Sequence, residues 1–504
     1  MEPGSQHILS SKFGLRSTGL VVFAGRMVSA FTGLLFTVMV ARWLTAAGFG
    51  TWEVIITLVT FSAYPVGTVA YWTTREVSRG RMIGRTSLVA GALLSSLGLV
   101  LFFAFTFVTY SVISASLIPF LLGALIVPLS YWSAVTNSLV QGYRPAVYGW
   151  SLVISEFAKL ATAYEALYVY HLGLDGVMVA LMASYLVQSL VSNYFVRLTT
   201  AERFNWTLVR KWSRLAWLPL LSYFPTVVAV ADTYVAAVGF GPGIVGYYQV
   251  AFIVASVVGY SGSLAFSLYP LLLRGGDESL PAQGIEFTLM FSIPLAVGLS
   301  AMAGPILFLF SSRVTQYTQV SASLQILALS SLIITISGVV DNILTGTERV
   351  DLGEKPRFWD LARSNLLFVP IANILYGVVY VASLYFALAY STSTGLGLSA
   401  RVEVWATMQV FAATLFLAIK ARRARGSARL LPSRSVLYYL FAAAIMGTVV
   451  YYVSSALGSQ GASTLLYGFE LVGVGALGAA VYFAVLFLAD SKFRGLVRAF
   501  LRRR

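Results

Sequence analysis

Residues 48–54 read GFGTWEV and residues 244–250 read IVGYYQV, so one pattern returns about 200 residues further along the chain. Gly50 aligns with Gly246, and in both copies an aromatic residue follows two positions later. Each stretch comes directly after a long apolar run. We therefore expect both stretches to be turns between helices, and the chain to contain an internal repeat.

Two further pairs of segments repeat in the same order. NSLVQGYR at 137–144 resembles NILTGTER at 342–349, and GLDGVMV at 173–179 has a weaker counterpart in GLGLSARV at 395–402. Copies that lie six helices apart have the same orientation, which predicts two halves related by an axis along the membrane normal. The alternative is that apolar helices ending in glycine align by chance.

The composition is that of a membrane protein. Of the 504 residues, 58% are hydrophobic and only 11% are charged, and the mean hydropathy is +0.81. A helix needs about 20 mostly apolar residues to cross a bilayer, and such runs follow one another from Leu20 to Ala489. The chain has no cysteine and only two histidines, which excludes thiolate and histidine metal clusters, so we expect no metal and no cofactor.

The apolar runs predict an all-α integral membrane protein with about fourteen transmembrane helices. The approximate spans are 17–41, 50–73, 84–108, 113–137, 146–170, 174–197, 215–239, 246–271, 285–310, 320–345, 364–389, 396–419, 435–456 and 463–489. Two pseudo-symmetric lobes of six helices are predicted at 1–200 and 201–425. Two additional helices and a basic tail follow at 426–504.

The basic residues sort by side of the membrane, which argues against nucleic acid as the reason for the net charge of +15. If the N-terminus is cytoplasmic, all but five of the 34 lysines and arginines fall in the N-terminal and C-terminal tails and the inner loops. Such an excess marks the cytoplasmic side. We therefore predict a multi-pass protein of the cell membrane with both termini in the cytoplasm, and a C-terminal tail, KFRGLVRAFLRRR, that faces anionic lipid.

Several segments, in order along the chain, resemble polysaccharide flippases. They are VARWLTAAGFGTWEVI (40–55), ADTYVAAVGFGPGIVGYYQVA (231–251), SLAFSLYPLLLRG (263–275), SIPLAVGLSAMAGPILFLFSS (292–312) and SLQILALSSLIITISGVVDNILTGTER (323–349). Together they resemble the lipid-linked oligosaccharide flippases of the multidrug, oligosaccharidyl-lipid and polysaccharide exporter superfamily. The chain departs from the family at 45–47, where Thr-Ala-Ala replaces a Gly-Pro-acidic turn, and in the unusually charged connection at 347–360.

The resemblance implies a transporter that works by alternating access. The saccharide headgroup of a polyprenyl or dolichyl phosphate would cross through a central polar cavity to the outer leaflet, while the tail stays in lipid. This activity would serve surface polysaccharide or glycan synthesis, with membrane lipids and a coupling ion, H+ or Na+, as further partners. An ion-coupled multidrug exporter of the same superfamily is the first alternative, and a membrane glycosyltransferase is a remote one.

Three ionisable residues interrupt the span at 146–170. Glu156 and Lys159 are three residues apart and share one helix face, whereas Glu165 lies on the opposite side near the outer surface. An ionised group near the bilayer centre costs about 3 kcal/mol or more, so such groups usually face a bundle interior or a wet cavity. Glu156 and Lys159 are interpreted either as a neutralised pair that permits insertion or as a wall that binds a sugar and its phosphate.

Two other spans carry isolated charges. Arg26 is basic with no acidic neighbour in its own helix, which suits a phosphate ligand, although snorkelling to the inner surface is the alternative. Asp232 is the single acidic residue in its span, where Pro219 and Pro225 predict a kink. We expect Asp232 to couple transport to protons or sodium.

Further ionisable residues fall near the predicted helix ends, where interfacial or gate-pairing roles are expected. They are Glu53, Glu165, Glu286, Asp341, Arg401, Glu403 and Glu470. No residue in the chain is expected to be catalytic, because the predicted outer loops are short and hold a single acid, Asp175.

Overall fold

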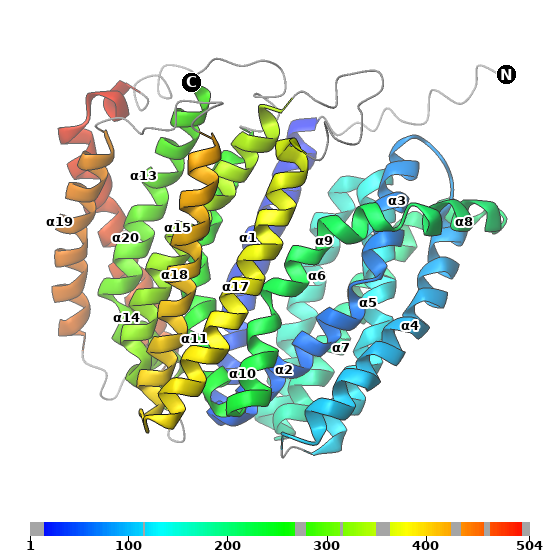
Figure 1. Cartoon of the computed structure of the whole chain (residues 1–504), viewed down its shortest axis with the longest axis horizontal. Helices are drawn as coiled ribbons and strands as arrows, with labels where there is room; N and C mark the ends of the chain where they lie inside the picture. The colour runs from blue at the N-terminus through cyan, green and yellow to red at the C-terminus, as the bar shows by residue number, and fades with distance from the viewer. Residues whose placement is uncertain are drawn as a thin grey trace. The chain divides into compact units, whose positions relative to one another are not determined.

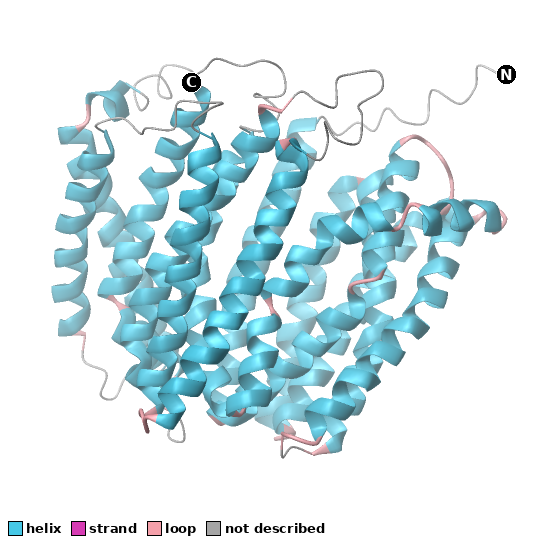
Figure 2. Ribbon diagram, in the orientation of Figure 1, coloured by secondary structure: helices cyan, strands magenta, loops and turns pink. Residues whose placement is uncertain are grey.

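The computed structural model describes residues 15–113, 116–267, 279–312, 316–348, 363–424, 435–457 and 464–495. Every regular element among these residues is a helix (Figure 2). The predicted all-α class is therefore confirmed. The C-terminal part of the basic tail and most of the charged connection at 347–360 lie outside the described residues.

The helices follow the predicted spans closely and are labelled in Figure 1. The longer ones are α1 Leu15–Trp43, α2 Ala46–Ala63, α3 Val66–Ser78, α4 Gly84–Tyr110, α5 Leu117–Tyr143, α6 Pro145–Tyr164, α7 Gly173–Val196, α9 Trp217–Ala229, α10 Ala231–Phe240, α11 Pro242–Ala255, α13 Leu280–Ala301, α14 Ala303–Phe310, α15 Ser321–Gly346, α17 Asn365–Ser393, α18 Leu398–Ala424, α19 Ser435–Ala456 and α20 Thr464–Ala489. The shorter ones are α8 Trp206–Arg214, the π-helix η2 Glu165–Val169, and the 3-10 helices η3 Arg197–Thr200, η4 Ser256–Ser267 and η5 Tyr317–Val320.

Twelve segments of the described chain are long and apolar enough to cross a membrane, against about fourteen predicted spans. The two predicted spans missing from the twelve are 17–41 and 146–170, and both are helical. Val28–Trp43 of α1 is a shorter apolar helix. α6 carries Glu156 and Lys159, which lower its hydropathy.

Three predicted spans are broken into two helices. The break after α2 lies at Tyr64–Pro65, where proline lacks a backbone N–H and starts a new helix. The break after α9 lies at Val230, and the break after α13 lies at Met302. Each break leaves backbone groups without helical partners, a feature that membrane proteins tolerate where other protein groups or a cavity satisfy them.

The chain divides into two compact units. Unit 1 comprises Met1–Leu44 and Thr51–Tyr234, and unit 2 comprises Thr45–Gly50 and Val235–Arg504. This division differs from the predicted lobe boundary at residue 200, because α8 and α9 pack against α3 of unit 1. Within unit 2, α19 and α20 share a core with α13 to which Met290, Tyr439 and Tyr482 contribute.

The repeated glycines of unit 2 meet at a helix crossing. A Cβ atom at Gly50 would overlap the carbonyl oxygen of Pro242, and one at Gly246 would overlap the carbonyl oxygen of Ala46. Gly50 thus lies against the carbonyl of Pro242, four residues before Gly246. In the same way, Gly246 lies against the carbonyl of Ala46, four residues before Gly50. The predicted turns at 48–54 and 244–250 were wrong, because α2 and α11 each begin one turn earlier and carry these glycines inside the helix.

Replacing Gly50 by alanine should destabilise the fold. The clash is with backbone, which no side-chain rotation relieves, so we expect Gly50→Ala to cost about 1–3 kcal/mol or more. Circular dichroism in detergent should show a lower midpoint of thermal unfolding. Gly243→Ala is the matched control on α11, because a Cβ there meets no atom within 4 Å. Equal midpoints for the two variants would contradict the proposed close crossing.

Candidate functional site

The candidate site lies where α1 and α6 pack in parallel within unit 1. At one end of the pair, a Cβ atom at Gly25 would lie 2.8 Å from the carbonyl oxygen of Gly149. At the other end, the Trp43 ring packs against Tyr168 with a centroid distance of 5.1 Å. The glycines bring the two helices close together, so polar side chains from both can meet between these ends.

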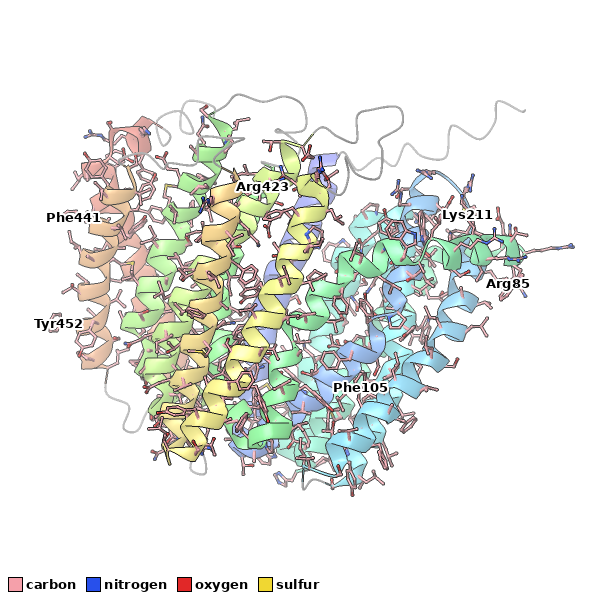
Figure 3. All side chains as sticks on the ribbon, viewed as in Figure 1. Arg85, Phe105, Lys211, Arg423, Phe441 and Tyr452 are labelled. Carbon is pink, nitrogen blue, oxygen red and sulfur yellow. The ribbon has the colours of Figure 1, made fainter. Side chains whose placement is uncertain are left out.

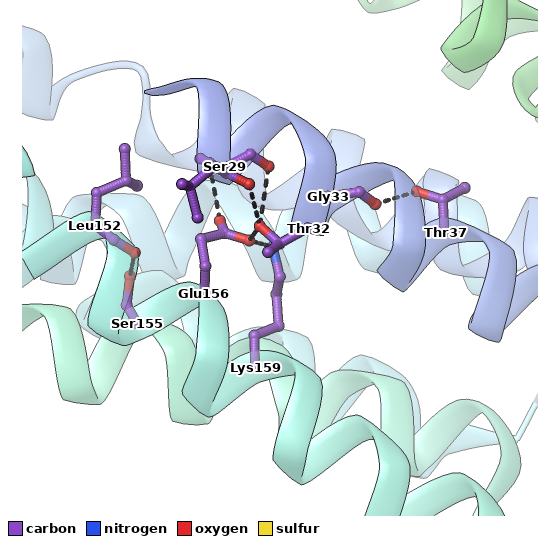
Figure 4. A network of polar contacts seen from close by, with 9 residues as sticks. Ser29, Thr32, Gly33, Thr37, Leu152, Ser155, Glu156 and Lys159 are labelled. Atoms are coloured by element: carbon purple, nitrogen blue, oxygen red, sulfur yellow. Dashed lines mark hydrogen bonds and ion pairs between the residues drawn. The ribbon is translucent and has the colours of Figure 1, made fainter. Parts of the chain in front are cut away.

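Glu156 is the centre of a polar network between these helices (Figure 4). Its carboxylate accepts hydrogen bonds from Ser29 Oγ at 3.1 Å and from Thr32 Oγ1 at 2.9 Å. Lys159 Nζ lies 2.7 Å from Glu156 Oε2. Glu156 is only 7% exposed, and a buried carboxylate needs hydrogen-bond donors, which Ser29, Thr32 and Lys159 supply. The predicted pair therefore forms, and α1 helps to hold it.

Lys159 is less fully satisfied than its partner. Its ammonium group has three N–H donors, and Glu156 takes one of them. The ammonium also lies 5.1 Å from the centroid of the Phe36 ring, a cation–π contact. Two donors of Lys159 thus have no acceptor among the described residues, and a ligand oxygen or water can take them.

Arg26 lies on α1, one helical turn before Ser29. Its side chain is exposed, and it makes no ion pair or hydrogen bond within the described part of the chain. All five guanidinium donors are therefore open to a ligand. The structure places Arg26 next to the Glu156 network along α1, but it does not pair the two.

Asp232 follows directly after the helix break at Val230. It is 5% exposed and lies in the first turn of α10. Its Oδ1 accepts a hydrogen bond from the backbone N–H of Thr233 at 2.7 Å. A carboxylate at a helix N-terminus is stabilised by the free N–H groups there. Pro219 and Pro225 lie inside α9, and the helix break comes later, at Val230, next to the α10 turn that carries Asp232.

The remaining predicted residues are not brought together. Glu165 is exposed on the π-helix η2, and Glu53 is half-buried on α2. Glu286 lies 3.6 Å from Lys492 Nζ. Of the other four, Asp341 pairs with Lys420. The last three are half-buried and form no ion pair among the described residues; they are Arg401, Glu403 and Glu470.

A second polar centre lies in unit 2; it contains the predicted residue Asp341, but its partner Lys420 was missed from the sequence. Lys420 Nζ lies 2.9 Å from Asp341 Oδ2 and donates to Ser337 Oγ and to Asn373 Oδ1, at 2.9 and 2.6 Å. These residues line a cavity of about 150 Å³. Lys420 had been assigned to a cytoplasmic loop, but α18 continues to Ala424 and buries it. The available signal was an acidic residue near the end of one span and a lysine near the end of another.

No protein-family model matches the chain, and no curated protein sequence matches it. Solved structures do. An inward closed structure of the lipid II flippase MurJ is similar with a TM-score of 0.65 and 13% identity, over 95% of this chain and 100% of that one. An inward-facing multidrug resistance MATE family transporter of the MOP superfamily is similar with a TM-score of 0.59 and 15% identity, over 81% and 98%.

A third similar structure is a MOP superfamily transporter from Pyrococcus furiosus, for which a binding pocket of reverse polarity is described. Its TM-score is 0.53 at 15% identity, over 82% of this chain and 96% of that one. At these identities the similarity establishes the fold. The chain therefore shares the all-helical fold of these transporter structures.

Replacing one member of the Glu156–Lys159 pair should lower the free energy of unfolding more than replacing both members. Glu156→Gln leaves the buried ammonium of Lys159 without its counter-charge, which typically costs about 3–5 kcal/mol. Adding Lys159→Met to Glu156→Gln should recover much of this loss. Thermal unfolding in detergent measures both variants, with Glu165→Gln as a control on an exposed carboxylate of the same span. Equal effects of Glu156→Gln and Glu165→Gln would show that the pair has no structural role.

Proposed function

We propose that this protein is a flippase for a lipid-linked saccharide. The headgroup, a sugar joined to a phosphate or diphosphate, crosses along unit 1, and the polyprenyl or dolichyl tail remains in lipid. The observation that carries the proposal is the set of unsatisfied cationic donors on two adjacent parallel helices, from Arg26 on α1 and Lys159 on α6. Similarity to a lipid II flippase over 95% of this chain supports it.

Phosphate is the ligand that suits these two side chains. A guanidinium presents its donors in a planar fork that matches phosphate oxygens in a bidentate contact, and an ammonium acts as a compact charge. Lys159 lies within a predicted membrane span, where a charge without a counter-charge is costly, so an anionic headgroup is favoured there. Glu156 orients Lys159, and about one acceptor site on its carboxylate remains for a sugar hydroxyl.

Asp232 is proposed as the coupling residue. It is buried at a break in a membrane-spanning segment, and binding of a proton or a sodium ion there would change the charge at the kink. Coupling is proposed to bias opening of the protein to one side of the membrane and then the other.

The proposed setting is the cell membrane, with both termini in the cytoplasm, because the basic residues concentrate in the tails and in one set of loops. Surface polysaccharide or glycan synthesis is the process that would use such an activity. Membrane lipids are the other partners.

An ion-coupled multidrug exporter is the second candidate. The likeness to MATE family transporters supports it. Exported drugs of this kind are commonly organic cations, which require an uncompensated carboxylate. The unsatisfied donors of unit 1 belong to cations instead, which favours an anionic substrate.

The experiment uses purified protein in liposomes that carry a labelled polyprenyl diphosphate sugar. An impermeant sugar-modifying enzyme should reach more of the label than in protein-free liposomes. Arg26→Ala removes charge-assisted contacts worth about 1.5–3 kcal/mol, so initial flipping should fall about tenfold or more. Arg26→Lys should retain part of the activity because the charge remains.

Arg422→Gln is the matched control, since Arg422 is an exposed basic residue at the end of α18.

Asp232→Asn should abolish stimulation by an imposed proton or sodium gradient while slow flipping without a gradient persists. Label accessibility no higher than in protein-free liposomes, with cationic dyes moved under a gradient, would contradict the flippase and support the exporter. Equal flipping by wild type and Arg26→Ala would remove Arg26 from the site.

A further inference from the structure

Helix α8 is a short amphipathic helix in the connection between the predicted spans 174–197 and 215–239. Its apolar residues Trp206, Val209 and Trp212 share one side, while Arg210, Lys211 and Arg214 share the other. The two faces differ in exposure: Trp212 is 2% exposed, and all three basic side chains are exposed. A helix of this kind is typical of the boundary between a membrane and water.

The apolar face of α8 closes one side of a groove in unit 1. The groove has a volume of about 440 Å³ and is formed by α3, α4, α8 and the start of α9. Its apolar lining includes Val69, Leu94, Leu97, Val209 and Leu220. Tyr64 also lines it, but the Tyr64 hydroxyl already donates to the Leu220 carbonyl. Ser213 in the lining likewise donates to the Arg210 carbonyl. The groove is therefore mainly apolar, with the Thr68 hydroxyl and the buried N–H of Trp212, which has no partner among the described residues, among its remaining polar groups.

The basic face of α8 lies beside further positive charge. The backbone N–H of Asn205, the N-cap of α8, donates to Thr86 Oγ1 at 3.0 Å, which ties the start of α8 to the first turn of α4. Arg85 is exposed in that turn. Figure 3 shows that Lys211 of α8 lies near the end of α4 that carries Arg85. Arg85, Arg210, Lys211 and Arg214 form no ion pair with any described residue, and the nearby loop contributes one acid, Glu202.

We propose that this groove binds one anionic phospholipid. The acyl chain occupies the apolar groove, and the headgroup phosphate meets the basic face of α8. The complementarity is specific to this occupant: the apolar lining alone suits any lipid tail, but the adjacent unpaired cations select a negative headgroup. Trp206 and Trp217, 60% and 63% exposed, flank α8 as indole rings do at the level of lipid headgroups.

The site is separate from the proposed headgroup site on α1 and α6, because none of its lining residues belongs to those helices. Its binding does not depend on the proposed transport activity. A lipid bound there would brace α8 and α9 against α3 and α4, all within unit 1.

Native mass spectrometry of the full chain in detergent tests the proposal, with phosphatidylglycerol and phosphatidylcholine as probes. Wild type should bind phosphatidylglycerol more tightly. Lys211→Gln/Arg214→Gln should lower its affinity about fivefold for each charge removed and leave the affinity for phosphatidylcholine unchanged. Leu94→Trp, which fills the groove, should weaken both lipids. Arg422→Gln should change neither.

Three results would overturn the proposal. Equal affinities for the two lipids in wild type would show that the basic face selects no headgroup. A preference for phosphatidylglycerol that survives Lys211→Gln/Arg214→Gln would place the lipid elsewhere. A polyprenyl phosphate that displaces phosphatidylglycerol at equal concentration, and is weakened by Leu94→Trp, would assign the groove to a substrate tail. Circular dichroism confirms that the variants remain folded.

Discussion

The close crossing of α2 and α11 at Gly50 and Gly246 is the tightest backbone contact made by any glycine in the described part of the chain. Each glycine lies against the carbonyl four residues before the other, so the contact is reciprocal and any side chain at either position would collide with backbone. Small residues allow membrane helices to approach closely, and lipid provides no hydrophobic force that could replace the lost packing. The chain leaves unit 2 for unit 1 directly after Gly50. The crossing thus packs the short segment Thr45–Gly50 against α11 within unit 2.

In unit 1 the corresponding constraint is electrostatic. Glu156 and Lys159 cannot be tolerated in an apolar helix unless they neutralise each other, and α1 supplies two hydroxyl donors that complete the carboxylate. The need for insertion explains why the pair exists. Within the pair, Lys159 keeps two N–H donors without an acceptor among the described residues. Arg26 keeps all five of its guanidinium donors. Those donors give the proposed phosphate site its chemistry. The observed pair is compatible with both interpretations that the sequence left open, and headgroup binding stays a prediction.

The helical class and most spans could be predicted, because long apolar runs admit few alternatives in a bilayer. The Glu156–Lys159 pair was also predictable, since residues three apart share a helix face. Its partners Ser29 and Thr32 were not, because they lie more than 120 residues away on another helix. Lys420 was misplaced because a lysine ending an apolar run reads as a loop residue. Helix α8 was missed because its basic residues are typical of a loop. The apolar residues Trp206, Val209 and Trp212 recur every three residues, which indicates an amphipathic helix.

The most direct test of the account is whether the charges of unit 1 recognise phosphate. Native mass spectrometry would compare binding of an isoprenyl diphosphate and of the isoprenyl alcohol of equal length to the purified protein. The account predicts that the diphosphate binds at least about tenfold more tightly, and that this difference disappears in Arg26→Ala/Glu156→Gln/Lys159→Met, which removes both cations without leaving an unpaired carboxylate. Equal binding of the two compounds, or a difference that persists in the triple variant, would contradict it.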